Sequence, residues 1–284
     1  MRVFICRLLL VLPVALYCGA AARAEGVIFP DLGEKVPGTD VTYLDLAHLV
    51  VPDLAAADAL YQGHKVIDVR HIAGDQITSA PPETLSFGYA AVLAVQSDGK
   101  DRLLILYDLG QATDSAEGFA VLALYSLAGT PKLLDAADIA YDQITNFLEP
   151  SHISLGEGKD AVITMSMHFN SNQDYVTSAL ILLRKDRLQL IDTIFTFSDK
   201  SCSFEHQQMP EFRAGDRDGR AYSDIVVTVT ETTKPTGEIC DGEDALQEAN
   251  RQIAVTYRWD EAASRFIVDS DALKVLAKED ESRF

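Results

Sequence analysis

The chain has 284 residues and a mass of 31.0 kDa, with 48% hydrophobic and 24% charged residues, fractions that exclude a mainly disordered or low-complexity protein. Acidic residues outnumber basic ones by 43 to 24, which gives a net charge of −19. Because such a surface repels phosphate backbones and anionic lipid headgroups, the composition argues against nucleic acid and against a membrane surface as partners.

Residues 1–24 have the pattern of a secretory signal peptide. Arg2 and Arg7 precede an apolar run from Leu8 to Tyr17, and the small-residue sequence Ala22-Arg23-Ala24 follows it. The run of about ten apolar residues is too short to cross a hydrocarbon core, which needs about 20. Removal of the three leader arginines would leave 21 basic and 43 acidic residues, a net charge of −22. The sequence thus predicts a periplasmic or secreted protein with no membrane insertion.

Residues 25–82 form an N-terminal segment of mixed character. Its opening is rich in Pro, Gly and Asp, as extended, turn-laden segments are. Asp53 precedes Leu54–Leu60, which predicts a short capped helix. The alternation of apolar and polar residues in Val66–Ile72 predicts a strand, and Pro81-Pro82 marks the end of the segment.

An internal repeat organises the remainder of the chain, 83–284, as a β-repeat domain. Its markers are Gly99-Lys100, Gly158-Lys159 and Gly219-Arg220, which stand 59 and 61 residues apart. In each unit one predicted strand precedes the marker and three follow, in meander order, and turn residues separate them. The units span about 88–145, 150–200 and 203–271. Their predicted strands are 90–96, 103–107, 119–127 and 132–134, then 152–155, 161–169, 176–183 and 188–197, then 211–213, 225–229, 253–259 and 265–268.

The segment 212–227 resembles the FG-GAP or VCBS-type repeat of β-propeller proteins. Those repeats carry closely spaced acids and a glycine before an apolar strand, as in Asp216, Asp218, Gly219 and Asp224 here. The resemblance implies a blade-like unit and a loop that binds Ca²⁺ through these three aspartates. The likeness is partial, because Ala214 replaces the first acid and Asp224 comes two residues late. A polar hairpin turn is the alternative reading of the loop.

A mainly β fold follows, built from antiparallel four-stranded units of about 60 residues with little helix. Closed propellers have about four to eight blades, more than the three units found. Residues 25–82 would supply a degenerate fourth blade, or the sheets would form an open, curved β-structure.

Two cysteines, Cys202 and Cys240, remain after removal of the leader. In an oxidising compartment they are expected to form one disulfide, with a pair of reactive thiols as the alternative. The bond would staple an insertion, Thr232–Asn250, to the start of the third unit. Long irregular loops of this kind are common recognition elements.

The sequence carries no recognisable catalytic motif, so no catalytic residue is assigned and no cofactor is expected apart from the candidate Ca²⁺. The leading hypothesis is a non-enzymatic β-repeat protein that binds another envelope protein or a small ligand. Its oligomeric state is left open. The alternative is an envelope hydrolase for glycans or phosphoesters that uses the aspartates of segment 212–227. The expected binding loop carries Glu238, Asp241, Glu243 and Asp244, which favour a basic partner patch or divalent cations.

Overall fold

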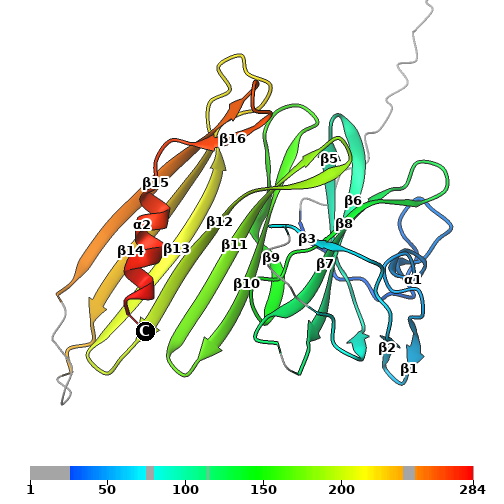
Figure 1. Cartoon of the computed structure of the whole chain (residues 1–284), viewed down its shortest axis with the longest axis horizontal. Helices are drawn as coiled ribbons and strands as arrows, with labels where there is room; N and C mark the ends of the chain where they lie inside the picture. The colour runs from blue at the N-terminus through cyan, green and yellow to red at the C-terminus, as the bar shows by residue number, and fades with distance from the viewer. Residues whose placement is uncertain (1–25, 75–79, 114, 239–246, 284) are drawn as a thin grey trace, which may run out of the picture.

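The computed structural model describes residues 26–74, 80–113, 115–238 and 247–283 as three sheets with two helices (Figure 1). The predicted signal peptide lies outside these residues. Helix α1 and strands β1 and β2 belong to the N-terminal segment, and β4, which follows it, completes a small sheet in the order β1-β2-β4. The elements of this part are α1 (Tyr43–Ala47), β1 (Ala55–Ala57), β2 (Leu60–Gly63), β3 (Arg70–His71) and β4 (Leu85–Phe87).

A five-stranded sheet occupies the middle of the molecule, in the order β3-β8-β7-β6-β5. Its strands β5 to β8 form an antiparallel meander, and β3 adds to β8 in parallel. Both faces of β5 and β7 are buried, which explains why these strands are almost continuously apolar. The strands are β5 (Ala91–Ser97), β6 (Lys100–Gln111), β7 (Gly118–Ser126) and β8 (Lys132–Asp138).

An eight-stranded antiparallel sheet runs without a crossover from β9 to β16. Strands β12 and β13 pair only at two positions near their shared turn, so the sheet is split there along most of its length. Helix α2 lies beside the split and contacts β12 and β15 (Figure 1). The elements are β9 (Ile144–Ser154), β10 (Asp160–Asn170), β11 (Gln173–Arg184), β12 (Arg187–Lys200), β13 (Phe204–Ala214), β14 (Ile225–Pro235), β15 (Ala249–Asp260), β16 (Arg265–Val268) and α2 (Ala272–Glu281).

The strand positions predicted from the three markers are confirmed, as is the mainly β character of the fold. Each unit is a four-strand meander, but the second and third units join in one open sheet. The propeller-like arrangement is therefore wrong, and no repeat of separate blades appears among the described residues. The regular spacing has a simpler origin. Each marker sits at the turn between the first and second of four consecutive antiparallel strands, so strands and turns of similar total length give similar spacings.

The markers of the first two units are in direct contact. The Gly99 amide donates to the Gly158 carbonyl oxygen at 2.8 Å. Two-residue hairpin turns commonly need positive φ at both central residues. Two of the predicted turns have it, at Asp98 and Gly99 and at Lys185 and Asp186.

The N-terminal segment departs from the predictions. Residues 54–60 do not form a helix, because β1 and β2 pair there as a hairpin. The Asp53 carboxylate accepts hydrogen bonds from the amides of His64 and Lys65 instead of capping a helix. The helix of this segment is α1, which Thr42 and Asp45 begin with a capping box. Of the predicted strand 66–72, only Arg70 and His71 pair with a neighbour.

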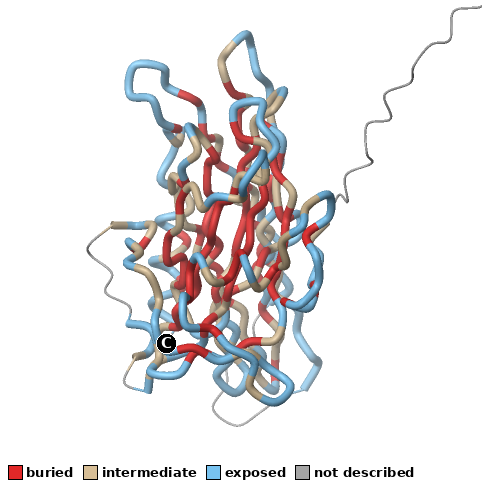
Figure 2. The backbone as a smooth tube through the Cα atoms, turned by 90° about the vertical axis from the view of Figure 1, so that its right-hand side faces the viewer, coloured by how far each residue is buried: buried red, intermediate tan, exposed pale blue. Residues whose placement is uncertain are grey.

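Three hydrophobic cores stabilise the fold, and Figure 2 shows that the buried residues gather in the middle of the molecule. The first joins the N-terminal segment to one face of the five-stranded sheet, through residues such as Leu46 and Tyr125. The second joins the opposite face of that sheet to β9, β10 and β11, as in the case of Leu122 and Ile181. The third lies on the other face of the eight-stranded sheet, where α2 contributes Leu276. Among the described residues, no helix is long and apolar enough to cross a membrane.

Candidate functional site

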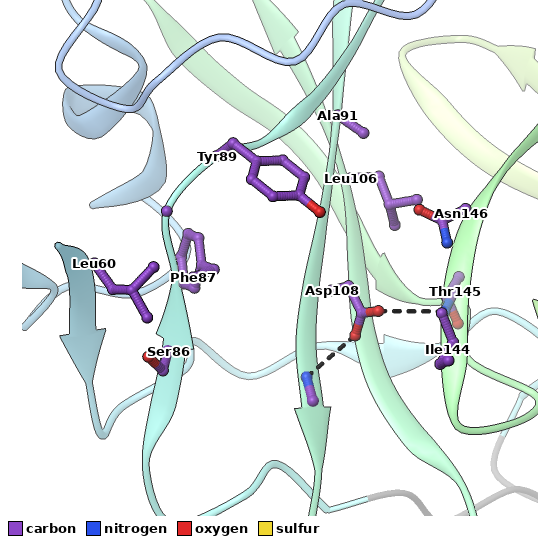
Figure 3. Close-up of a pocket in the computed structure, with 12 residues that line it drawn as sticks. Leu60, Ser86, Phe87, Tyr89, Ala91, Leu106, Asp108, Ile144, Thr145 and Asn146 are labelled. Carbon is purple, nitrogen blue, oxygen red and sulfur yellow. Dashed lines mark hydrogen bonds between the residues drawn. The ribbon is translucent and has the colours of Figure 1, made fainter.

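The three sheets meet around a cavity of about 410 Å³ (Figure 3). Strands β2 and β4 of the small sheet form one wall, β5 and β6 of the middle sheet form the back, and β9 of the large sheet closes the other side. The size falls within the range of small-molecule sites. The lining residues are Leu60, Ser86, Phe87, Gly88, Tyr89, Ala91, Leu106, Asp108, Gly110, Ile144, Thr145 and Asn146.

Asp108 is the single charged residue of this lining. Side chains alternate along β6, and Leu104 and Leu106 face the second core, between the two large sheets. Asp108 continues their face and reaches the place where the core gives way to the cavity (Figure 3). The register between β6 and β7 shifts between Asp108 and Gln111, and Gly110 within this β-bulge has φ +88°. Bulges of this kind often re-aim a side chain next to a functional site.

The Asp108 carboxylate accepts two backbone hydrogen bonds. The Gly110 amide donates to Oδ1 at 3.1 Å and the Thr145 amide donates to Oδ2 at 3.3 Å. Burial raises the pKa of Asp108, although both hydrogen bonds act in the opposite direction. No lysine or arginine among the described residues pairs with this carboxylate. A partly buried negative charge thus faces the cavity without a protein cation to balance it.

Exposed apolar side chains gather at the mouth of the cavity. Tyr89 is 63% exposed and Phe29 is 59% exposed, and their rings meet edge to face at 5.9 Å. Leu60 and Ile144, on opposite walls, are 44% and 43% exposed. Single exposed apolar residues are ordinary, but a group around a cavity is typical of a binding site. The arrangement can hold an apolar body at the mouth and a hydrogen-bond donor or cation at Asp108.

The three aspartates expected to bind Ca²⁺ lie elsewhere, in the loop between β13 and β14. Arg220 pairs with Asp218 at 3.3 Å and with Asp224 at 2.5 Å, and Arg258 approaches Asp224 at 3.4 Å. The Asp216 carbonyl oxygen accepts the Asp224 amide. Among the residues that the structure describes, no group of three or more acidic, His or Cys side chains is placed to hold a metal ion. Arginine side chains occupy the positions next to Asp218 and Asp224 that a cation would take.

The expected binding loop is shorter than the sequence suggested. Thr232 pairs with Asn250 and Thr233 with Ala249, so both ends of the insertion belong to strands β14 and β15. Glu238 is exposed beyond the end of β14. Asp241, Glu243, Asp244 and Cys240 lie outside the described residues, so the Cys202–Cys240 disulfide stays a prediction.

A second polar cluster connects α2 to the large sheet. Asp280 is fully buried and accepts a hydrogen bond from Gln208 Nε2 at 2.8 Å. His206, also buried, lies between the Thr233 hydroxyl and the Glu231 carboxylate. Glu231 additionally pairs with Arg251 and Arg283. Each charge faces an opposite charge or a hydrogen-bonding group of another element, so this cluster fastens α2 to the sheet.

Sequence reasoning missed Asp108, although a signal was present. The residue ends the apolar run Leu103–Tyr107 and stands two positions before a glycine. A lone acid within an otherwise buried strand is unusual, because burial of an unpaired charge is costly. That it faces a cavity depends on β9 and β4, which come from other parts of the chain.

Comparison with protein-family models, curated proteins and solved structures finds no match to this chain. The resemblance of segment 212–227 to propeller repeats therefore gains no support from a relative, and the functional argument depends on the geometry of the cavity.

Proposed function

We propose that this is a non-enzymatic, periplasmic or secreted binding protein that holds a small amphipathic molecule in the cavity where its three sheets meet. One observation carries the proposal: a partly buried carboxylate with no basic partner among the described residues faces a largely apolar cavity, whose mouth carries the exposed Tyr89 ring in contact with Phe29. Ligand sites are commonly apolar clefts with few, well-placed polar groups. Strands of three sheets supply most of the lining, which favours a preformed site.

The competing proposals rest on other parts of the chain. An envelope protein that binds segment 232–250, stapled by the Cys202–Cys240 disulfide, remains a proposal based on the sequence alone. A hydrolase would use Asp216, Asp218 and Asp224, and none of them lines the cavity. No contact of the described residues favours either of these alternatives over the cavity.

Titration with Nile red, a neutral apolar dye that fluoresces in apolar surroundings, tests the proposal. Asn146 is half-buried and its side chain faces the cavity (Figure 3). We expect Asn146→Trp to fill the site and to weaken dye binding by about tenfold or more. The control is Gln252→Trp, which places the same side chain at an exposed position of β15 and is expected to bind dye as the native protein does.

Circular dichroism of both variants would confirm that they are folded. Equal dye binding by the native protein and a folded Asn146→Trp variant would show that the cavity is not the binding site, and it would overturn the proposed function.

A further inference from the structure

The charge of the cavity lining is unusual because no basic residue accompanies its acid. The twelve lining residues include Asp108 and no Lys, Arg or His. An anionic ligand would meet this carboxylate at close range in surroundings that screen charge poorly, so anions are disfavoured. A neutral ligand would cover the carboxylate and leave it without a counter-charge. A cation would both fill the cavity and balance Asp108.

Aromatic rings add a second preference for a cation. Tyr89 lines the cavity and is 63% exposed, and Phe29 contacts its ring. Phe87 also lines the cavity, but its ring is buried in the first core against Tyr107. The faces of aromatic rings attract ammonium groups, and aromatic side chains combined with a carboxylate are typical of sites for alkylated ammonium ions. In Figure 3 the Tyr89 hydroxyl points toward the part of β6 that carries Leu106 and Asp108. The lining thus offers both kinds of group that such an ion binds.

The chemistry of the lining also separates an organic cation from a metal ion. Ca²⁺ takes about six to eight oxygen ligands. The cavity offers one carboxylate, whose oxygens already accept backbone hydrogen bonds, among mostly apolar side chains. Apolar walls are suited to alkyl groups and poorly suited to a hydrated metal ion. The acidic character of the whole chain, with a net charge of −19, would attract cations of either kind to the surface.

We propose, building on the proposed function, that the ligand is an organic ammonium ion with apolar substituents, whose charge lies against Asp108 and whose alkyl groups lie against Tyr89 and Leu106. The proposal adds the ligand class to the site, so the two can be tested separately.

Competition between Nile red and a pair of isosteric probes tests the ligand class. Choline and 3,3-dimethylbutan-1-ol have the same shape, and they differ in that carbon replaces the quaternary nitrogen. We expect choline to displace Nile red at a concentration about tenfold or more below that of the alcohol. Asp108→Asn should remove this preference. The control Asp40→Asn, at a fully exposed side chain, should retain the preference.

Potassium chloride and calcium chloride at matched ionic strength separate the ammonium ion from cations in general, and neither should displace the dye. Equal displacement by choline and the alcohol, no displacement by choline, or displacement by either salt would overturn the ammonium assignment and leave the binding function intact. Because choline and its isostere are compared on the native protein, this result does not depend on the folding of a variant. Dye binding that Asn146→Trp fails to weaken would instead overturn the binding function itself.

Discussion

Asp108 and Asp280 are both carboxylates whose pKa is raised by burial, yet their surroundings differ. Asp108 opens onto a cavity, where an external cation can balance its charge. Asp280 is fully enclosed between α2 and the sheet, with Gln208 as its hydrogen-bond donor. Burial therefore leaves the Asp108 carboxylate available to a ligand, whereas burial of the Asp280 carboxylate lowers the stability of the folded protein. Substitution of Asp280 can measure that cost.

Burial raises the pKa of Asp280 to about 6, above the value of 3.8 that it has in the unfolded chain, although the Gln208 hydrogen bond and the nearby Arg283 act in the opposite direction. Because the folded state favours the protonated carboxyl, its contribution to stability is fully present below 3.8 and is lost as the pH rises through about 6. Asp280→Asn keeps the acceptor for Gln208 and removes the charge. We expect the variant to be more stable by about 2 kcal/mol near pH 8, and the gain to vanish near pH 4.

Urea unfolding of the native protein and of Asp280→Asn across this pH range would measure the difference. Asp40→Asn serves as the control for loss of one surface charge, since the Asp40 side chain is fully exposed. A gain in stability that is independent of pH would contradict the account given for Asp280.

The strand turns at one end of the sheets interlock. At this end the Asp98 carboxylate accepts the Lys185 amide, and Lys159 reaches the Ala221 carbonyl oxygen. Lys159 also lies over the Tyr222 ring at 4.7 Å. These contacts join turns of all three four-strand units, so the elements are held together by polar contacts at their ends as well as by the cores between them.

Gly158→Ala tests how closely two of these turns approach. Gly158 has φ +68°, and a Cβ atom there would lie 2.5 Å from the Gly99 Cα atom. Gly219 has a similar φ of +76°, but its Cβ would meet no atom within 4 Å. We expect Gly219→Ala to lower the free energy of unfolding by about 1 kcal/mol through backbone strain alone. Gly158→Ala should cost about 3 kcal/mol, because the turns must separate. Equal costs, measured by urea unfolding, would show that the close contact has no energetic weight.

Helix α2 seals the third core of the molecule by contacting both β12 and β15, on the two sides of the split in the large sheet. Leu276 faces this core and is 2% exposed, whereas the neighbouring Val275 is 48% exposed. We expect Leu276→Ala to lower the free energy of unfolding by about 3 kcal/mol. Val275→Ala should change it by about 0.5 kcal/mol or less. Chemical denaturation of both variants provides the measurement, and similar effects would mean that α2 does not close the core.

At the scale of the whole molecule, the sequence determined the strands and their order within each meander. Apolar runs such as Leu103–Tyr107 and turn pairs such as Asp98-Gly99 are local signals, because hairpin pairing needs only neighbouring segments. The predictions from the sequence were wrong at Asp53, where a local helix-cap signal competes with hydrogen bonds to residues further along the chain. Asp53 has the character of a helix cap, but its carboxylate is used by amides eleven and twelve residues further along the chain.

Tertiary structure alone decided how the meanders combine and where a site forms. The spacing of the three markers is compatible with separate blades or with a continuous sheet. The structure has the continuous sheet. Strands β12 and β13 are paired at two positions near their turn, and α2 packs beside the split between them. Asp108 becomes a candidate ligand residue because β2, β4 and β9 meet around it. Those strands are far apart in the sequence, and periodicity carries information about the face of a strand but none about which distant strand will cover it.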